Sequence, residues 1–381
     1  MKSPASEIER GARSHPPVLA ADAARPLGDA RWNWQTVRRV LVVRLRSIGD
    51  TVLATPSLHA LRRFLPDARI DILLEDWVAP LLEGSADVDR IVTVERKSNA
   101  ARIAIARALR AERYDVAYNL HGGSTASMLT WASRARQRVG YADYRYARLH
   151  NHTAPPSSKL WGRERTHSAE QQLALLGWTG IPVSDRPATR LPIGQEAAHA
   201  VARRLAASNI KETQDFVLLH PAAAFDSKTW AAENFARVVE HLAARGLAVV
   251  AVAAPQEATV VEAVAARSSA PVASLTDLAL PEVTALAARA RLFVGNDSGV
   301  AHIAAAVSTP TVVIFGSSNV AHWRPWTRAA SEVVREEMAC APCAGYSCAE
   351  FPEAQCIRRV SVERVLEAVE RVLAVEREDA R

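Results

Sequence analysis

The chain lacks the short motifs that identify several common enzyme classes. It has no Gly-x-Gly-x-x-Gly after its first apolar segment and no Gly-x4-Gly-Lys-Ser/Thr, so neither a dinucleotide-dependent dehydrogenase nor a P-loop ATPase is expected. It also has no Gly-x-Ser-x-Gly elbow and no His-Glu-x-x-His pair, which argues against an α/β-hydrolase and a zinc peptidase. No uncharged apolar run approaches the roughly 18 residues that a membrane-spanning helix needs.

The composition is that of an ordinary globular protein with a basic balance. Of 381 residues, 49% are hydrophobic and 23% charged, and the length favours two domains of roughly 150–200 residues. The net charge of +6 favours anionic partners, namely nucleic acid, an acidic membrane surface or phosphorylated substrates. Because no helix-turn-helix, RNA-binding signature or complete zinc finger is present, nucleic acid is not an expected partner.

Apolar segments of strand length alternate with helical patterns along most of the chain, which predicts an α/β fold built on parallel sheets. The expected strands are 40–45, 69–74, 90–94 and 115–120, then 216–219, 248–253, 271–275, 292–294 and 311–315. Prolines interrupt the pattern between about 150 and 195. We therefore expect a disordered leader at 1–35, which lacks the apolar core of a secretory signal, one domain at 36–190, a second at 191–360, and a closing helix and tail at 361–381.

One turn in each half has the features of a phosphate or ligand site. Gly295, Ser298 and Gly299 follow an apolar strand and open a helix near Val300, where backbone N–H groups and the helix dipole favour an anion. The first half repeats this arrangement, since 40–45 leads through Ser47 and Gly49 into a helical pattern. Two such sites predict two facing α/β domains.

Isolated polar residues follow the predicted strands, at the edge where open α/β sheets bind ligands. They are Asp50, Lys228, Glu257, Asp297, Ser298 and His302. Lys228 fits either a diphosphate clamp opposite a helix N-terminus or a solvated loop lysine. Glu257 fits either a ribose ligand or a helix-terminal carboxylate that needs no ligand.

Two further clusters stand out. The four cysteines, Cys340, Cys343, Cys348 and Cys356, fall in one late segment, 340–356, where either a structural metal or local pairing, or plain reduced thiols, would fit the spacing. The segment 134–148 carries arginines with interleaved tyrosines, and it is either an anion-binding surface or a solvated loop. Its arginines are Arg134, Arg136, Arg138, Arg145 and Arg148.

An ordered set of short segments resembles glycosyltransferase family 9, the bacterial ADP-heptose:lipopolysaccharide heptosyltransferases. The matching segments are 42–52 with Thr55-Pro56, Asn119-Leu120-His121-Gly122, Arg138-Val139-Gly140-Tyr141, His220-Pro221 to Lys228-Thr229-Trp230, 295–302, and Phe315-Gly316-Ser317-Ser318. The chain departs from the family at Val300 and in the alanine run at 222–224. No residue assigned a catalytic role is lost by these departures.

The resemblance implies a GT-B architecture, which has two Rossmann-like doubly wound domains facing a central cleft. It implies an inverting transfer of heptose from ADP-heptose to the lipopolysaccharide inner core, a lipid A-Kdo or heptosyl acceptor. Asp50 would be the general base, and Lys228 would neutralise the departing ADP. The donor would contact Lys228, Glu257, Asp297, Ser298, Gly299 and His302, and the acceptor would contact Ser47, Gly49, His121, Arg136 and Arg138.

The same resemblance implies no obligatory cofactor, although a divalent cation could stimulate transfer. The Asp-x-Asp at Asp87 and Asp89 precedes a predicted strand and belongs to a turn rather than to a metal site. The expected partners are the nucleotide sugar, a phosphorylated lipid-anchored glycan acceptor and the anionic inner membrane. A monomer at the cytoplasmic face of that membrane is expected.

Two other functions also fit the residues. One is a GT-B transferase for a UDP- or GDP-sugar, whose base would be selected by apolar contacts around Leu278, Leu280 and Pro281. The other is a non-catalytic nucleotide or sugar-phosphate binding module, against which the retention of Asp50 with Lys228 argues.

Overall fold

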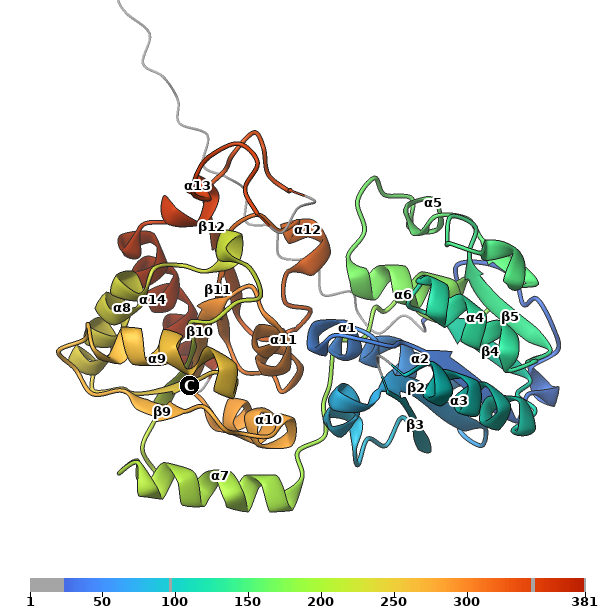
Figure 1. Cartoon of the computed structure of the whole chain (residues 1–381), viewed down its shortest axis with the longest axis horizontal. Coiled ribbons are helices and arrows are strands. Elements are labelled where there is room, and N and C mark those ends of the chain that lie inside the picture. Colours follow the sequence, from blue (N-terminus) through green and yellow to red (C-terminus); the bar gives the residue numbers. More distant parts are fainter. Residues whose placement is uncertain (1–23, 96–97, 344–346, 380–381) are drawn as a thin grey trace, which may run out of the picture.

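Two α/β domains make up the protein, each with a six-stranded parallel sheet covered by helices (Figure 1). The computed structural model describes residues 24–95, 98–343 and 347–379. The first sheet contains β1 (Arg39–Val43), β2 (Arg69–Glu75), β3 (Arg90–Val94), β4 (Val116–Asn119), β5 (Gln137–Tyr141) and β6 (His152–Ala154). Its helices are α1 (Ile48–Val52), α2 (Thr55–Phe64), α3 (Asn99–Ala111), α4 (Ser124–Ala132), α5 (Ser157–Trp161) and α6 (Ser168–Gly177).

The second domain repeats this plan. Its strands are β7 (Phe216–His220), β8 (Ala248–Val252), β9 (Ala273–Leu275), β10 (Leu292–Asn296), β11 (Thr311–Phe315) and β12 (Ser331–Arg335). Its helices are α7 (Gln195–Ala207), α8 (Ala232–Ala244), α9 (Ala258–Ala265), α10 (Leu280–Arg289), α11 (Gly299–Ala306), α12 (Val320–Trp323), α13 (Gln355–Arg358) and α14 (Val362–Asp379). The expected fold class of two doubly wound parallel sheets is confirmed.

Both sheets have the same strand order, which fixes where a ligand can bind. The orders are β3-β2-β1-β4-β5-β6 and β12-β11-β10-β7-β8-β9, so the first and fourth strands of each domain are central neighbours. At this switch point the connections after the two strands diverge to opposite faces and leave room beyond the carboxyl ends. The functional residues of each domain are therefore expected beyond β1 and β4 and beyond β7 and β10.

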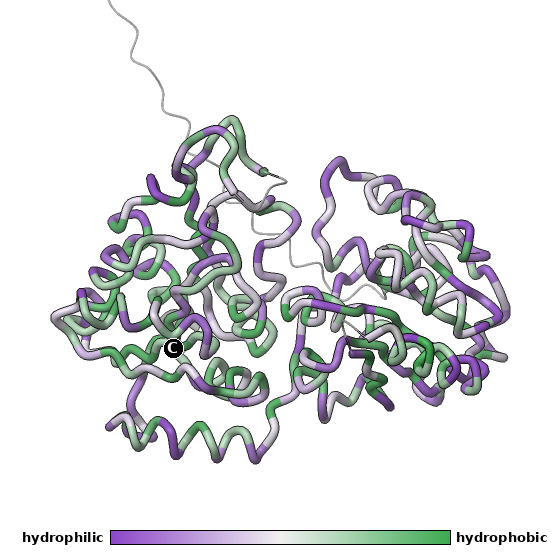
Figure 2. The backbone as a smooth tube through the Cα atoms, in the orientation of Figure 1, coloured by the Kyte–Doolittle hydropathy of each residue, from purple (hydrophilic) through white to green (hydrophobic). Residues whose placement is uncertain are grey.

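The central strands are apolar because helices cover both of their faces. Residues 40–43 of β1 and all of β10 are buried. Figure 2 shows hydrophobic colouring in the interior and a mixed pattern on outer helices such as α7. On α7 the buried residues Ala197, Val201 and Leu205 recur every fourth position, which lays one apolar stripe on the domain.

The expected disordered leader is corrected in part. Residues 1–23 lie outside the described residues, but 24–35 pack on the first domain. Leu27, Trp32 and Trp34 contact the core, and the Trp34 indole donates to the Thr179 carbonyl over 3.0 Å. The apolar tryptophans, not the polar residues around them, decide the structure of this segment.

Three strands were not predicted because their sequences are short or polar. They are β5, β6 and β12, of which β5 begins inside the basic segment 134–148. Arg138 lies in β5, and its guanidinium donates to the carbonyls of Leu149 and Ala135 over 3.1 and 2.8 Å. This part of the segment is therefore structural rather than a solvated loop.

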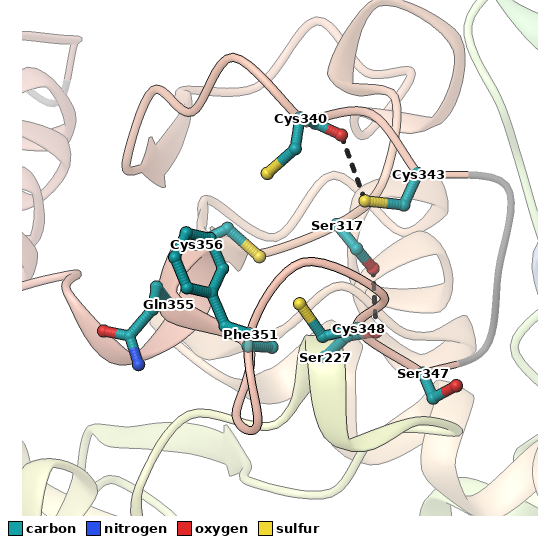
Figure 3. A pocket seen from close by; sticks show the side chains of 10 residues that line it. Ser227, Ser317, Cys340, Cys343, Ser347, Cys348, Phe351, Gln355 and Cys356 are labelled. Atoms are coloured by element: carbon teal, nitrogen blue, oxygen red, sulfur yellow. Dashed lines mark hydrogen bonds between the residues drawn. The ribbon is translucent and has the colours of Figure 1, made fainter.

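The cysteine segment closes over the second domain beside the turns that follow β7 and β11. All four cysteines are free thiols, and together with Ser227, Ser317 and Phe351 they line one small pocket (Figure 3). Over 24–95, 98–343 and 347–379 no group of three or more His, Cys, Asp or Glu side chains has the spacing to hold a metal ion. The structure thus gathers the four cysteines at one pocket, and the alternatives of a structural metal, local pairing and reduced thiols stay predictions.

No helix in the described part of the chain is long and apolar enough to cross a bilayer.

One contact between the domains centres on His167, the N-cap residue of α6. Its Nδ1 accepts from the Ala169 N–H over 3.1 Å, and its Nε2 lies 2.8 Å from the Arg324 carbonyl in the second domain. Its ring stacks on Trp326 with centroids 4.6 Å apart. One nitrogen must accept while the other donates, so the neutral imidazole fits this position and the protonated form does not. Burial lowers the pKa of His167 to about 3.

We expect His167 to make stability depend on pH. Its pKa is below the unfolded value of about 6.5, so the unfolded chain binds the proton first, and stability is lost as pH falls through 6.5 toward 3. Between pH 7.5 and 5.5 the wild type should lose about 1.4 kcal/mol more unfolding free energy than His167→Asn, which keeps an N-cap acceptor but does not titrate. Urea unfolding at both pH values measures this difference. Parallel losses in the two proteins would contradict the assignment.

Candidate active site

The first half of the site lies beyond β1, where the chain turns sharply into α1. Ser47 caps the helix with φ +68°, and its Oγ accepts from the Asp50 N–H over 3.2 Å. A positive φ is uncommon outside glycine and costs conformational energy, so the surrounding structure must hold this turn. The turn places the Asp50 carboxyl group in the first turn of α1, with 18% of its side chain exposed.

Arg44 fixes the orientation of Asp50, a role that the sequence analysis did not assign. This buried arginine donates from Nη2 to the Asp50 carboxylate and from Nε to the Asp50 carbonyl over 3.3 Å. It also donates from Nη1 to the Leu120 carbonyl over 3.0 Å, which ties the end of β1 to the end of β4. The signal in the sequence was an arginine directly after four buried strand residues, where a charge needs a partner.

His121 completes this half of the site. Its Nδ1 lies 3.4 Å from Arg44 Nη1, and Asn119 Oδ1 accepts from the backbone N–H groups of His121 and Gly122 over 3.1 and 3.0 Å. Burial, followed by the charge of Arg44, lowers the pKa of His121 to about 4. The ring is therefore neutral at pH 7, and since arginine can only donate, Nδ1 is the acceptor.

The second half lies beyond β10, where α11 begins. Ser298 is the N-cap residue of α11, but its side chain makes no capping hydrogen bond. Ser298 Oγ and His302 Nδ1 are both buried, and neither has a hydrogen-bond partner among the described residues. An unpaired buried polar group costs about 1–3 kcal/mol, so two of them at one helix N-terminus point to a polar ligand.

Lys228 and Asp297 form a pair at the edge of this turn. Lys228 Nζ donates to Asp297 Oδ2 over 2.8 Å, and Ser318 Oγ donates to the same oxygen over 2.5 Å. The Lys228 side chain is 22% exposed and that of Asp297 only 7%. Asp297 therefore holds the lysine in place, and the lysine is the member of the pair that can reach an incoming anion.

Two predicted donor residues lie nearby in supporting positions. Glu257 Oε2 accepts from the Ala254 N–H over 3.2 Å at the end of β8, the strand beside β7. His302 is buried, which lowers its pKa, while the charges of Asp297 and Asp50 act in the opposite direction. The opposing effect of Asp50 shows that the two halves of the site are close enough to interact electrostatically. Leu278 and Leu280, expected near the base, are partly buried against the core.

Two glycines bring the halves together. A Cβ on Gly49 would lie 2.7 Å from His302 Cδ2, and a Cβ on Gly299 would lie 2.7 Å from Cβ of Ile48. Real Cβ atoms essentially never approach that closely. The starts of α1 and α11 therefore contact each other directly across the domain boundary, and Gly49 serves this contact.

The structure brings most of the predicted site residues together but separates two. The first-domain group lies at the start of α1 and the end of β4 and consists of Ser47, Gly49, Asp50 and His121. Across the domain boundary lies the second-domain group, which consists of Lys228, Asp297, Ser298, Gly299 and His302. Glu257 lies beyond the neighbouring strand, β8. Arg136 and Arg138 lie at the amino end of β5, the opposite edge of the sheet, where Arg136 is 80% exposed beside Asp115. The two arginines are therefore separated from Asp50, and their contact with the acceptor stays a prediction.

His322 was not predicted and lies near the site. It comes from α12, and its Nδ1 is 3.2 Å from the Thr166 carbonyl of the first domain. Burial lowers the pKa of His322. The charge of Asp50 raises this pKa, and the charge of Arg44 lowers it. A lone histidine without a motif gave no signal in the sequence.

Comparison with known proteins assigns this geometry to a family. The chain is 30% identical over 308 residues to lipopolysaccharide heptosyltransferase 3 of Escherichia coli, covering 74% of this chain and 85% of that protein. A glycosyl transferase family 9 structure from Veillonella parvula superposes with a TM-score of 0.79 at 21% identity, over 88% of this chain and 97% of the other. The E. coli ADP-heptose lipopolysaccharide heptosyltransferase II gives 0.73 at 22% identity, over 89% and 99%.

The two structural likenesses agree with the GT-B fold expected from the sequence. Residues 102–353 match glycosyltransferase family 9 (heptosyltransferase), which spans most of both domains. Together with the identity to the curated relative, this match shows that the chain is a glycosyltransferase and belongs to glycosyltransferase family 9.

Proposed function

We propose that the enzyme transfers a heptose from ADP-heptose to the lipopolysaccharide inner core, on a lipid A-Kdo or heptosyl acceptor, with inversion at the anomeric carbon. The observation that carries the proposal is the pair of unpaired buried groups at the start of α11, Ser298 Oγ and His302 Nδ1, on the helix that contacts Gly49 of the first domain. The diphosphate oxygens supply acceptors for hydrogen bonds donated by the Ser298 hydroxyl and by the Nδ1–H tautomer of His302. The names of the similar proteins, which include ADP-heptose and lipopolysaccharide, support this choice of substrates.

The diphosphate of the donor binds at the N-terminus of α11. There the backbone N–H groups and the positive end of the helix dipole meet its charge. Lys228, held by Asp297, adds a positive charge at the edge of the same turn. As the bond between the anomeric carbon and the diphosphate oxygen breaks, this fixed charge stabilises the leaving ADP.

Asp50 removes the proton from the attacking acceptor hydroxyl. The acceptor oxygen forms its bond to the anomeric carbon from the side opposite the leaving diphosphate, so configuration inverts in one displacement. Arg44 holds the carboxylate on the strand end, while Ser47 and the neutral His121 border it in the first domain. We place the phosphorylated, lipid-anchored acceptor on this side and the enzyme at the anionic inner face of the cytoplasmic membrane.

We expect Asp50→Asn to lower kcat for transfer by about 10²–10⁴-fold, because general base catalysis contributes that much and an amide cannot accept the proton. Asparagine keeps an oxygen for the Arg44 guanidinium, so the variant should fold and should bind ADP as the wild type does. The measurement is transfer from ADP-heptose to a purified heptose-deficient core acceptor. Activity above a tenth of wild type would remove Asp50 from the mechanism.

Replacing Lys228 by alanine should weaken ADP binding about 10- to 150-fold. The loss corresponds to one charge-assisted hydrogen bond of about 1.5–3 kcal/mol. Isothermal titration calorimetry with ADP measures it, and Lys211→Ala, at an exposed lysine of the same domain, is the matched control. Equal affinities of the two variants for ADP would mean that Lys228 only forms its bond to Asp297.

The choice of nucleotide base is tested by comparing the affinities of the wild type for ADP, UDP and GDP.

A further inference from the structure

The outer face of the first domain carries apolar side chains that no part of the described chain covers. Helices α3 and α4 lie side by side on one face of the sheet (Figure 1). Leu109 of α3 and Leu129 of α4 point into the same core cluster. On their outer side, Ile103 is 56% exposed, Met128 50% and Trp131 42%. These are three of the seven large exposed hydrophobic residues in the described chain, gathered on two neighbouring helices.

Arginines surround these apolar side chains. Arg107 and Arg110 follow Ile103 at four and seven positions, so they lie along the same side of α3 and are exposed. The Arg134 guanidinium lies over the Trp131 ring, 5.0 Å from its centroid. We call these six residues, Ile103, Arg107, Arg110, Met128, Trp131 and Arg134, the α3–α4 surface.

The acids of this region do not neutralise the arginines of the surface. Residues 98–142 contain seven arginines and two acids, Glu112 and Asp115. Glu112 pairs with Arg69 and Arg90, and Asp115 accepts from the backbone N–H groups of Arg38 and Arg39. Both acids are therefore engaged at the amino edge of the sheet, and the α3–α4 surface keeps a net positive charge.

The combination of exposed tryptophan, isoleucine and methionine with unneutralised arginine fits one partner by its chemistry. An anionic bilayer offers phosphates for guanidinium groups and an interfacial layer in which tryptophan and short apolar side chains are stable. A purely apolar protein partner would leave the arginines without counterions. A purely acidic one would leave the apolar side chains exposed.

We propose that the α3–α4 surface docks the enzyme on an anionic phospholipid bilayer. Ile103, Met128 and Trp131 enter the interfacial layer, and the three arginines contact lipid phosphates. Helix α4 begins at Ser124, close to His121, but Trp131 and Arg134 lie at its other end, near the amino edge of the sheet. The surface is therefore proposed for the bilayer alone, and the docking does not rest on the proposed acceptor.

The test is co-sedimentation of the full-length protein with vesicles that contain neither donor nor acceptor. Vesicles of phosphatidylglycerol and phosphatidylethanolamine should bind the wild type, those of phosphatidylcholine should not, and binding should fall as salt screens the charges. Arg107→Gln with Arg110→Gln should lower the partition coefficient roughly 25-fold, about fivefold for each arginine. Met128→Ser with Trp131→Ser should also lower it.

The matched control is Arg203→Gln with Lys211→Gln, which removes the same charge from exposed positions of the second domain. It should change binding less than twofold. No binding by the wild type, equal binding to neutral vesicles, or unchanged binding of the two surface variants would each overturn the proposal. A dimer seen by analytical ultracentrifugation that the same variants dissociate would overturn it in favour of a second copy of the chain.

This result is separable from the proposed function. All the substituted residues are exposed and remote from Lys228 and Asp297, so ADP affinity should stay at the wild-type value in every variant. Vesicle binding that fails while ADP still binds rejects only the docking surface. Vesicle binding without any affinity for ADP-heptose rejects only the proposed donor.

Discussion

The contact between the starts of α1 and α11 is the constraint on which the site depends. Each helix follows a central strand of its own sheet, and each carries a glycine where a side chain would collide with the other domain. His302 occupies the space that a side chain at position 49 would need, and Ile48 occupies the space that a side chain at position 299 would need. Without this close approach, the carboxylate of the first domain and the anion-binding turn of the second would be separate half-sites with no shared chemistry.

Each half of the site is organised by a cation and a carboxylate, but the two pairs work in opposite senses. In the first domain the cation, Arg44, is buried and fixes the carboxylate of Asp50, the proposed base. In the second the carboxylate, Asp297, is buried and fixes Lys228, the cation proposed to contact the diphosphate. Under the proposed function, this arrangement presents a carboxylate to the acceptor and a positive charge to the donor diphosphate, which is the polarity that glycosyl transfer requires.

The sequence alone predicted the features that depend on local pattern. Nine strands with strong apolar character were predicted close to their observed positions, and Asp50, Lys228 and Ser298 were selected as candidate site residues because they follow such strands. The strands β6 and β12 were missed because edge strands need fewer apolar residues, and β5 was missed because its sequence, Gln137–Tyr141, begins with polar residues. Arg136 and Arg138 were grouped with the acceptor residues, but density of charge does not tell which end of a strand it lies on, and the structure puts them at the amino end of β5. His167 and His322 depend on contacts between distant segments, which no local pattern encodes, whereas Arg44 directly follows a predicted strand and its role was not recognised.

A crystal structure of the enzyme with ADP tests the central claim most directly, because it shows whether the two orphaned groups of α11 receive a partner. The account predicts the β-phosphate at the N-terminus of α11, within hydrogen-bond distance of Ser298 Oγ and near Lys228 Nζ, on the side that faces Asp50. ADP bound elsewhere, or phosphates that leave Ser298 and Lys228 without contact, would contradict it.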